Sequence, residues 1–548
     1  MDTLPPFATH RVENQPPPFA PRDLWNDDAA LREAVRREGG DDFAGQLAAY
    51  GVLAGGDIYA LSFDAHRDKP RLRSHDAYGR RIDLVEFHPN YHAIMRAAIE
   101  HGVAGLSWHD PRPGAHVARA ALSYLHHQVE PGTSCPLTMT HAAVPVLRHA
   151  PALGEWMRKA AAPHYDGRDI GSGDKAGVTL GMGMTEKQGG SDVRANETVA
   201  TPIGGPGGDE YELVGHKWFF SAPMSDGFLV LAQAPGGLSC FLMPRWHPHG
   251  GKNALRLMRL KDKLGDWSNA SSEVEFQGAW AQRIGEEGRG VATIIEMVML
   301  TRLDCMLGSA GEMRMALAQA LHHARHRRSF GKPLLDHALM RNVIADLAIE
   351  SEAATALAIR VAGAIDRAGR DPHEAAFARI ATAIGKFWIC KRAPAFVNEA
   401  QECLGGAGYV EESILPRLYR QAPLNSIWEG SGNIQCLDVL RALAREPEAG
   451  RALLTELERA RGRHDALDAR IDELAPALRG QAPPQEAQMR GWVERLALAL
   501  QSALLFVADS PSADAFCRSR LGGAHGLGFG TLPADLDFEV IVQRGLPA

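Results

Sequence analysis

Glu429, in the turn SIWEGSGN just before an amphipathic helical segment, is the residue that we single out for acid–base chemistry. A carboxylate can remove a proton from carbon when partial burial and a bound apolar ligand raise its pKa. The alternative interpretation is that Glu429 caps the following helix or pairs with an arginine. The residue and its spacing alone leave both interpretations open.

A second candidate is the segment GMGMTEKQGGSDV, residues 181–193. Thr185 offers a hydroxyl and a backbone N–H close to a strand end, and Gly189-Gly190-Ser191 lets the backbone approach a bulky anionic group. Thirty residues later, GHKWFFS (215–221) places aromatic residues and a further hydroxyl at the end of another strand. By themselves, a Gly-Gly-Ser turn is usually only a turn, and aromatic strand residues usually belong to a core.

The elements that must position these residues follow a simple order. A proline-rich start precedes a helical pattern from Leu47 to His149, and short Val- and Phe-rich segments between Gly177 and Arg283 are typical of a β domain. Amphipathic helical patterns return from Gly290 and continue beyond Glu446. We therefore predict an α+β protein with an extended N-terminal arm (1–45), an N-terminal helical domain (46–180), a β domain (181–285), a helical bundle (286–446) and an additional C-terminal helical domain (447–548).

Composition excludes several classes of protein. The chain has 548 residues, of which 45% are hydrophobic, and a formal charge of −7, so it has no general attraction for nucleic acid or an anionic membrane. Its longest apolar run, 496–508, is too short to span a bilayer. Seven widely spaced cysteines without a CxxC pair indicate reduced thiols in a cytoplasmic protein rather than disulfides or a metal site.

Read together, the motifs resemble one known family. MTEKQGGSDV, GHKWFFS, LKDKLG, HRRSFGKPL, ECLGGAGYVEE, RLYR and NSIWEGSGNI follow in chain order, and this set is similar to the acyl-CoA dehydrogenases. These are flavoproteins that oxidise the Cα–Cβ bond of acyl-CoA thioesters. In detail the resemblance is to the adaptive-response (AidB) branch, known for FAD binding, DNA binding and induction by alkylation damage. It extends from NQPPPF at residue 14 into the last helices and implies a β-barrel or sandwich in the middle domain and a four-helix bundle after it.

The resemblance implies FAD as cofactor and assigns residues to it. Met184 and Thr185 match positions that face the flavin ring, Ser191 matches a pyrophosphate contact, and Ser221 matches the hydroxyl near flavin N5. Arg327, Ser329 and Phe330 match a segment that reaches the FAD of a neighbouring subunit, so FAD binding implies a homotetramer (a dimer of dimers). The remaining implied FAD contacts are Gly190, Phe219, Phe220, Gly405, Gly406, Ser426, Ile427, Trp428, Gly430, Ser431 and Asn433. Ser431 is also a reasonable N-cap for the following helix.

The resemblance also favours Glu429 as the base that abstracts the α-proton of the thioester. Three departures qualify the transfer: Ala338 and Glu402 stand where the family commonly has Gln, and Trp428 stands where it often has Tyr or a smaller residue. The first two suggest altered cofactor contacts across the subunit boundary. The bulky Trp428 indole would narrow the acyl channel.

Double-stranded DNA binding by the C-terminal helices is a further implication of the resemblance. Residues 447–548 contain eleven Arg, no Lys and fourteen acidic residues, so any attraction to phosphate requires arginines sorted to one face. No base-reading element is evident, and backbone contacts are expected. The alternative is a solvated face of Glu–Arg pairs. The candidate DNA contacts are Arg441, Arg445, Arg459, Arg461, Arg463, Arg518 and Arg520.

Two functions are therefore carried forward. The first is an FAD-binding, acyl-CoA dehydrogenase-like protein of the alkylation response, with weak dehydrogenation of short or branched acyl-CoA and binding of double-stranded DNA. The alternative is a catabolic acyl-CoA dehydrogenase with no DNA role. Oxidation of nitroalkanes on the same fold is less favoured, because the relatives that carry it out use Asp as base.

Overall fold

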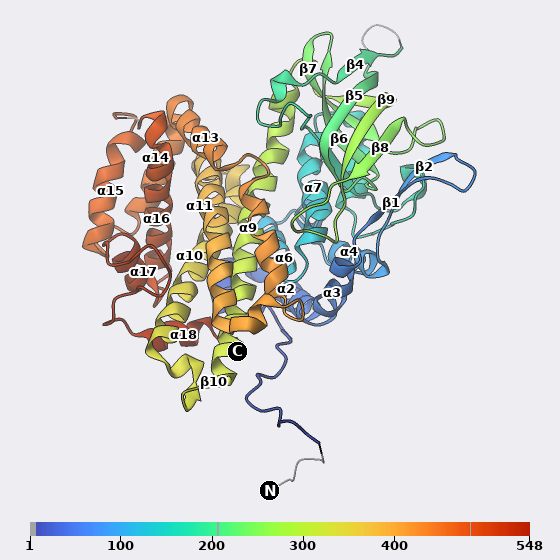
Figure 1. Cartoon of the computed structure of the whole chain (residues 1–548). Helices are drawn as coiled ribbons and strands as arrows, with labels where there is room; N and C mark the ends of the chain where they lie inside the picture. Colours follow the sequence, from blue (N-terminus) through green and yellow to red (C-terminus); the bar gives the residue numbers. More distant parts are fainter. Residues whose placement is uncertain (1–6, 205–207, 483, 548) are drawn as a thin grey trace.

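A computed structural model describes residues 7–204, 208–482 and 484–547. A β domain and a group of C-terminal helices lie on opposite sides of a bundle of long helices (Figure 1). The predicted α+β class, with a β domain between two helical parts and further helices at the C-terminus, is confirmed. No helix in the described ranges is both long and apolar enough to cross a membrane.

The N-terminal part is helical except for one hairpin. Its elements are α1 (Ala29–Arg37), α2 (Ala44–Leu53), α3 (Tyr59–Arg67), β1 (Arg71–His75), β2 (Arg81–Glu86), α4 (Pro89–Glu100), α5 (Leu106–His109), α6 (Ala115–His127), α7 (Pro131–Leu147) and α8 (Gly154–Ala161). The β1–β2 hairpin interrupts the helical pattern expected over 47–149. Its turn forms because Asp76 accepts hydrogen bonds from the backbone of Tyr78 and Arg80, and Gly79 adopts a φ of 76°.

The predicted arm is wrong from residue 29 onward, because α1 belongs to the core. The carboxylate of Asp28 accepts a hydrogen bond from the backbone N–H of Leu31 and so caps the helix. Leu31, Ala34 and Val35 are fully buried on one face of α1. The proline-rich sequence that suggested an arm therefore ends before a short amphipathic helix that packs on the bundle.

The middle domain is a barrel. Its strands are β3 (Leu180–Gly183), β4 (Val199–Pro202), β5 (Glu210–Ser221), β6 (Gly227–Ala234), β7 (Gly237–Pro244), β8 (Leu255–Leu260) and β9 (Ser271–Ile284). Pairings β6–β4, β4–β5, β5–β9, β9–β7 and β7–β6 close on themselves, while β3 and β8 pair with β6 and β9. Aromatic side chains fill the interior, among them Phe220, Phe228, Phe241 and Phe276.

The bundle is built on three long helices, α9 (Gly290–His326), α10 (Ala338–Ala368) and α11 (Pro372–Leu404), followed by α12 (Leu415–Gln421) and α13 (Gly432–Arg445). A small hairpin, β10 (Arg328–Ser329) and β11 (Lys332–Pro333), follows α9. Helices α9 and α11 position the candidate site, because each contributes a side chain that bonds to the turn containing Glu429.

The C-terminal helices share the bundle's core and do not form a core of their own. They are α14 (Pro447–Glu458), α15 (Asp465–Leu478), α16 (Met489–Val507), α17 (Ala513–Arg520) and α18 (Phe538–Gly545). Buried Arg360 of α10 bonds Glu456 of α14 at 2.9 Å. On α18, Arg544 bonds both Glu352 of α10 at 2.8 Å and Glu33 of α1 at 2.5 Å, so the last helix meets the first.

All seven cysteines are buried and free of disulfide bonds. This agrees with the interpretation of the cysteines as packed, reduced thiols.

Candidate active site

Glu429 lies in a strained turn between a short 3₁₀ turn (Leu424–Ser426) and α13. Its φ is +59°, a left-handed conformation that a residue with a side chain seldom adopts, and Gly430 follows with a φ of +92°. The hydroxyl of Thr301 on α9 donates a hydrogen bond to Oε2 of Glu429 at 2.7 Å. This hydrogen bond directs the carboxylate toward α9. The side chain makes no capping hydrogen bond to α13.

Three side chains hold the backbone of this turn. Nζ of buried Lys386 donates to the carbonyls of Trp428 and Gly430 at 2.7 and 2.6 Å. Arg302 and Gln435 both donate to the carbonyl of Glu429, at 3.1 and 3.0 Å. Backbone strain persists only when its surroundings over-determine it, and these hydrogen bonds, of which those from Lys386 and Arg302 are charge-assisted, supply that constraint.

Burial raises the pKa of the Glu429 carboxyl above its usual value, while the Thr301 hydrogen bond and the charges of Arg302 and Lys386 oppose the rise. A raised pKa makes the ionised carboxylate a stronger acceptor of a proton from carbon. The site can therefore act as a general base, whereas neither an N-cap role nor an ion pair accounts for the way it is held: α13 receives no side-chain cap.

The turn after β3 is fixed by a fully buried ion pair. Nζ of Lys217 on β5 lies 2.7 Å from Oε1 of Glu186, and the Thr198 hydroxyl donates to the same oxygen at 2.6 Å. Burial alone would raise the pKa of Glu186, but the hydrogen bonds from Lys217 and Thr198 hold it at about 2. The pair is therefore ionised, and it ties the turn to two strands of the barrel.

The surface of that turn fits an anionic group. Gly190 and Ser191 are exposed, and neither their backbone N–H groups nor the Thr185 hydroxyl bonds to protein in the described ranges. A Cβ on Gly190 would lie 2.4 Å from Oγ1 of Thr185, so only glycine keeps this hydroxyl accessible. Free amides beside free hydroxyls are the donors that the phosphates of FAD require.

The other residues predicted for FAD on the β domain lie around the end of β5. Phe219 is exposed, the Ser221 hydroxyl lies 3.1 Å from that of Ser271, and the carbonyl of Met184 accepts from Asn196. The side chain of Phe220 points the other way and is fully buried against Phe228 in the barrel. The structure therefore corrects the prediction for Phe220, because only its backbone can face a cofactor.

The residues predicted around the Glu429 turn lie together. Ile427 is exposed, and the indole N–H of Trp428 donates to Asn425 at 3.0 Å. Ser431 is at the N-cap position of α13, as predicted, although its hydroxyl makes no cap bond. The Ser426 hydroxyl donates to the carbonyl of Pro423, and Asn433 accepts from Arg490 of α16.

Arg327, Ser329 and Phe330 lie in the β10–β11 hairpin, at the opposite end of α9 from Thr301. A helix rises about 1.5 Å per residue, so some 37 Å of α9 separate Thr301 from the hairpin. Phe330 is 98% exposed. Gly405 and Gly406 are also exposed, in the turn that follows α11. Within one subunit, therefore, the hairpin cannot join the site at Glu429.

Sequence reasoning missed Thr301, Arg302 and Lys386. Thr301 and Arg302 are 128 and 127 positions from Glu429 along the chain, and Lys386 is 43 positions away. The one signal in the sequence is the polar Thr-Arg pair within an apolar helical stretch, EMVMLTRLDCML. That pattern predicts a buried polar contact but names no partner.

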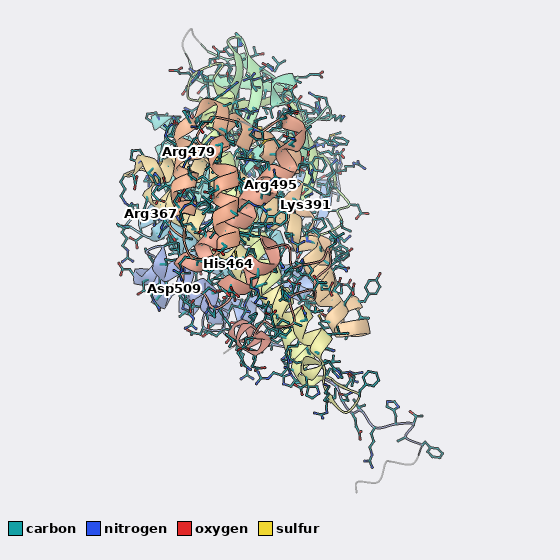
Figure 2. All side chains as sticks on the ribbon, turned by 90° about the vertical axis from the view of Figure 1, so that its left-hand side faces the viewer. Arg367, Lys391, His464, Arg479, Arg495 and Asp509 are labelled. Atoms are coloured by element: carbon teal, nitrogen blue, oxygen red, sulfur yellow. The ribbon has the colours of Figure 1, made fainter. Side chains whose placement is uncertain are left out.

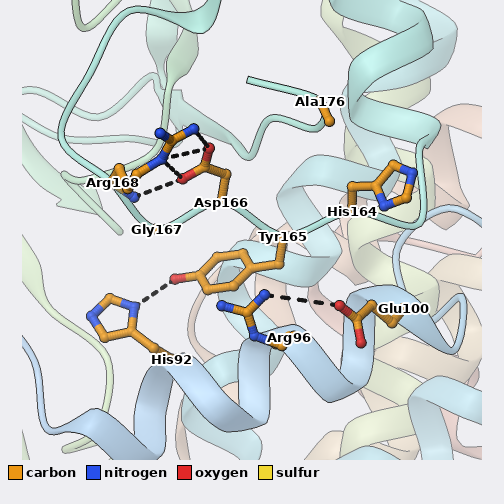
Figure 3. A pocket seen from close by; sticks show the side chains of 9 residues that line it. All are labelled: His92, Arg96, Glu100, His164, Tyr165, Asp166, Gly167, Arg168 and Ala176. Carbon is orange, nitrogen blue, oxygen red and sulfur yellow. Dashed lines mark hydrogen bonds and ion pairs between the residues drawn. The ribbon is translucent and has the colours of Figure 1, made fainter. Parts of the chain in front are cut away.

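A cavity lies away from Glu429, between α4 and the segment before β3 (Figure 3). It has a volume of about 620 Å³, and its polar groups pair with one another: His92 Nδ1 lies 2.8 Å from the Tyr165 hydroxyl, and Arg168 bonds Asp166. None of the residues predicted for catalysis or FAD lines it. This cavity is therefore separate from the candidate site at Glu429.

Comparison with known proteins is consistent with that geometry. Family models match along the chain: the N-terminal domain of the adaptive response protein AidB over residues 14–167, and the acyl-CoA dehydrogenase middle and C-terminal domains over 181–279 and 288–444. The AidB protein of Escherichia coli (strain K12) is 46% identical over 519 residues, which is 94% of this chain and 95% of the relative. The chain belongs to the acyl-CoA dehydrogenase family. It is therefore an FAD-dependent oxidoreductase of the type that acts on CH–CH groups.

Two further acyl-CoA dehydrogenase relatives extend the comparison. Acyl-CoA dehydrogenase family member 11 of Caenorhabditis elegans is 32% identical over 77% of this chain and 70% of its own length. The crystal structure of C. elegans ACDH-11 in complex with C11-CoA superimposes with a TM-score of 0.82 at 26% identity, covering 99% of this chain and 93% of that one. The similarity therefore includes the C-terminal helices as well as the three family domains.

Replacing Gly190 with Ala tests the FAD turn. The new methyl group collides with Thr185, and overpacking of this kind costs about 1–3 kcal/mol, so FAD affinity should fall roughly tenfold or more. Affinity is measured by fluorescence titration of the apoprotein with FAD. Gly173→Ala is the matched control, because a Cβ there meets nothing within 4 Å. Equal affinity of the two variants would contradict the assignment of this turn.

Proposed function

We propose that this protein oxidises the Cα–Cβ bond of short or branched acyl-CoA thioesters, slowly, with Glu429 as the base that removes the α-proton. The observation that supports the proposal is the orientation of the Glu429 carboxylate by Thr301 in a turn that Lys386, Arg302 and Gln435 hold rigidly. A proton acceptor must keep its position throughout the reaction, and this arrangement provides such a position.

Three side chains have separate roles in the proposed reaction. Glu429 accepts the proton, Thr301 orients the accepting carboxylate, and Lys386 keeps the turn from relaxing. Bound FAD supplies the acceptor for the hydride that leaves the β-carbon. Thr185, Gly190 and Ser191 would hold its phosphates, with Phe219 and Ser221 beside the ring.

Glu429→Gln should abolish bleaching of the flavin when the holoenzyme is mixed anaerobically with isovaleryl- or butyryl-CoA, while FAD stays bound. The wild-type bleaching rate should rise as pH rises through the elevated pKa of Glu429, because only the ionised carboxylate accepts a proton. Stopped-flow absorbance measures both effects.

The matched control for this variant is Glu412→Gln, an exposed carboxyl on the same bundle, which should bleach at the wild-type rate. Bleaching of Glu429→Gln at more than a few per cent of the wild-type rate would remove Glu429 as the base.

We also propose a homotetramer in which the β10–β11 hairpin of one subunit reaches the FAD of another. Large apolar side chains at the ends of the bundle helices support this proposal, since Phe330, Leu339 and Tyr409 are almost fully exposed. Phe330→Glu should dissociate the tetramer and weaken FAD binding together, as measured by light scattering and flavin fluorescence. A tetramer with normal FAD content in this variant would count against the assembly.

A role in the alkylation response is proposed on similarity alone, since the N-terminal family model and the E. coli relative are both named for AidB. The buried free cysteines support a cytoplasmic location. For DNA, the contacts of the arginines favour the alternative, an enzyme with no DNA role. Arg520 is 6% exposed and bonded to Asp346 and Glu350, so the prediction that it contacts DNA is wrong.

Most of the other candidate arginines have an acidic partner, although Asp438, the partner of Arg441, also pairs with Arg302 and Arg379. Arg459 bonds Glu456 at 2.9 Å, Arg461 bonds Glu458 and Asp472, and Arg463 bonds Asp509 at 2.7 Å, while Arg518 pairs with Asp535 and Arg441 with Asp438. Arg445 alone of the set is exposed without an ion pair among the described residues. Figure 2 shows the face formed by the C-terminal helices, with Asp509, the partner of Arg463, labelled on it.

Replacing Arg459, Arg461 and Arg463 together with Gln should therefore leave affinity for duplex DNA within about twofold of the wild type, because paired arginines release few counterions. Fluorescence anisotropy at two salt concentrations measures this affinity. The exposed Arg445→Gln is the comparison. A steep loss confined to the triple variant would restore the DNA proposal.

A further inference from the structure

The guanidinium group of Arg302 bridges the Glu429 turn and helix α13. Its Nε donates to the carbonyl of Glu429 at 3.1 Å, and its Nη1 donates to Oδ2 of Asp438 at 2.7 Å. Both side chains are buried, with 7% of Arg302 and 6% of Asp438 exposed. Because the guanidinium group is planar and rigid, the bond that holds Nη1 also determines where Nε points.

Asp438 is bonded from a second long helix as well. Nη2 of Arg379 on α11 donates to Oδ1 of Asp438 at 3.0 Å, and Nε of Arg379 donates to Glu446, the residue before α14, at 3.0 Å. Arg441, one turn further along α13, adds a longer and more exposed contact at 3.4 Å. A row of ion pairs therefore leads from the Glu429 turn through Asp438 to the start of the C-terminal helices.

The Asp438 carboxyl is ionised in this arrangement. Burial alone would raise its pKa, but the charges of Arg302 and Arg379 and the hydrogen bonds that they donate lower it below its usual value. Without this carboxylate, the guanidinium group of Arg302 would be buried with no counter-charge, which costs free energy in a protein interior. Asp438 therefore offsets part of the positive charge that Arg302 places beside Glu429.

Two cations and two thiols lie near the Glu429 carboxyl. The cations are Arg302 of α9 and Lys386 of α11, which both bond the backbone of the turn. The thiols are those of Cys135 on α7 and Cys305 on α9. Burial raises the pKa of Cys135 to about 12 and that of Cys305 well above its usual value, so both thiols stay neutral. The charge beside Glu429 therefore comes from the two cations.

We propose that Asp438 is a positioning residue for the base: its carboxylate holds the guanidinium group of Arg302 against the carbonyl of Glu429 and offsets the charge that Arg302 brings to the site. This inference rests on the proposed role of Glu429 in acyl-CoA oxidation and adds a residue that acts on it through another side chain. The side chain of Asp438 bonds no atom of the Glu429 turn in the described part of the chain. Its effect therefore passes through Arg302, so the two residues are interdependent.

Infrared difference spectroscopy of the FAD-loaded protein measures the titration of Glu429 without any thioester, since the band that is lost in Glu429→Gln identifies this carboxyl. In Asp438→Asn the charge of Arg302 is no longer offset, and a nearby positive charge favours the ionised carboxylate. We therefore expect the titration midpoint of Glu429 to fall by about half a pH unit or more. The pH profile of flavin bleaching by butyryl-CoA should fall equally, with a plateau rate about tenfold lower because the turn is held less firmly.

Arg302→Gln tests whether Asp438 acts through Arg302. Removal of the cation should raise the midpoint of Glu429, because the ionised carboxylate loses a favourable charge. Addition of Asp438→Asn to this variant should cause no further shift. A double variant in which the two shifts add would show that Asp438 acts independently of Arg302, and this result would overturn the inference.

Glu456→Gln is the matched control for Asp438→Asn. Glu456 is also buried, with 3% exposed, and it also bonds two arginines, Arg360 of α10 and Arg459, neither of which bonds the Glu429 turn among the described residues. This variant should keep the wild-type midpoint. An equal shift in Glu456→Gln would attribute the effect to general loosening of the bundle and would overturn the inference.

If Asp438→Asn fails to fold, Arg379→Gln decides. Without Arg379 the carboxylate of Asp438 offsets the charge of Arg302 more fully, so the midpoint of Glu429 should rise, opposite in sign to the shift expected for Asp438→Asn. A fall or no change would overturn the inference.

The inference and the proposed oxidation can fail separately. Midpoints that shift as expected in a protein that no acyl-CoA thioester bleaches would support the role of Asp438 toward Glu429 and contradict the oxidation. Bleaching of the wild type together with an unchanged midpoint in Asp438→Asn would support the oxidation and overturn the inference.

Discussion

The proposed active site depends on one buried ammonium group, that of Lys386. It bonds the carbonyls on either side of Glu429 and so holds a left-handed turn against the relaxation that a non-glycine residue would otherwise favour. Burying a lysine ammonium group costs free energy unless its N–H groups donate hydrogen bonds. Here two backbone carbonyls accept them. The direction of the Glu429 carboxylate, the start of α13 and the contact with α9 all follow from this arrangement.

The same principle recurs at other junctions of the fold. The Lys217–Glu186 pair fixes the turn after β3 that we propose for FAD, and Arg360 joins α14 to the bundle. In each case a buried cation lies between segments that are far apart in the sequence. Breaking such a pair leaves an unpaired charge in the interior, so these contacts specify the arrangement of the elements as well as stabilising it.

Much of this architecture was predictable from the sequence, because local patterns determine it. The order of helical and β segments, the glycine turn before Ser191 and the turn at Glu429 can all be recognised in short stretches. Helix α1 was missed, since prolines dominate the composition around it. Phe219 and Phe220 show what a finer use of strand periodicity offers: adjacent strand residues face opposite sides, so only one of the two could face outward.

What the sequence could not supply was the partner of each charged group. Thr301, Arg302 and Lys386 reach Glu429 across distant positions, and the arginines proposed for DNA are paired with acids both three residues away and much further off. The composition gives the number of charged residues, but only the folded structure shows which of them are left unpaired and can bind a ligand.

The contact between Arg544 and Glu33 has a consequence for how the fold would come apart. It joins α18 to α1 across 511 positions of the chain, and Arg544 also bonds Glu352 of α10. Because three helices share this one guanidinium group, loosening of α18 would leave the carboxylates of Glu33 and Glu352 without their cation. We therefore expect α1 and α18 to open together rather than independently of each other.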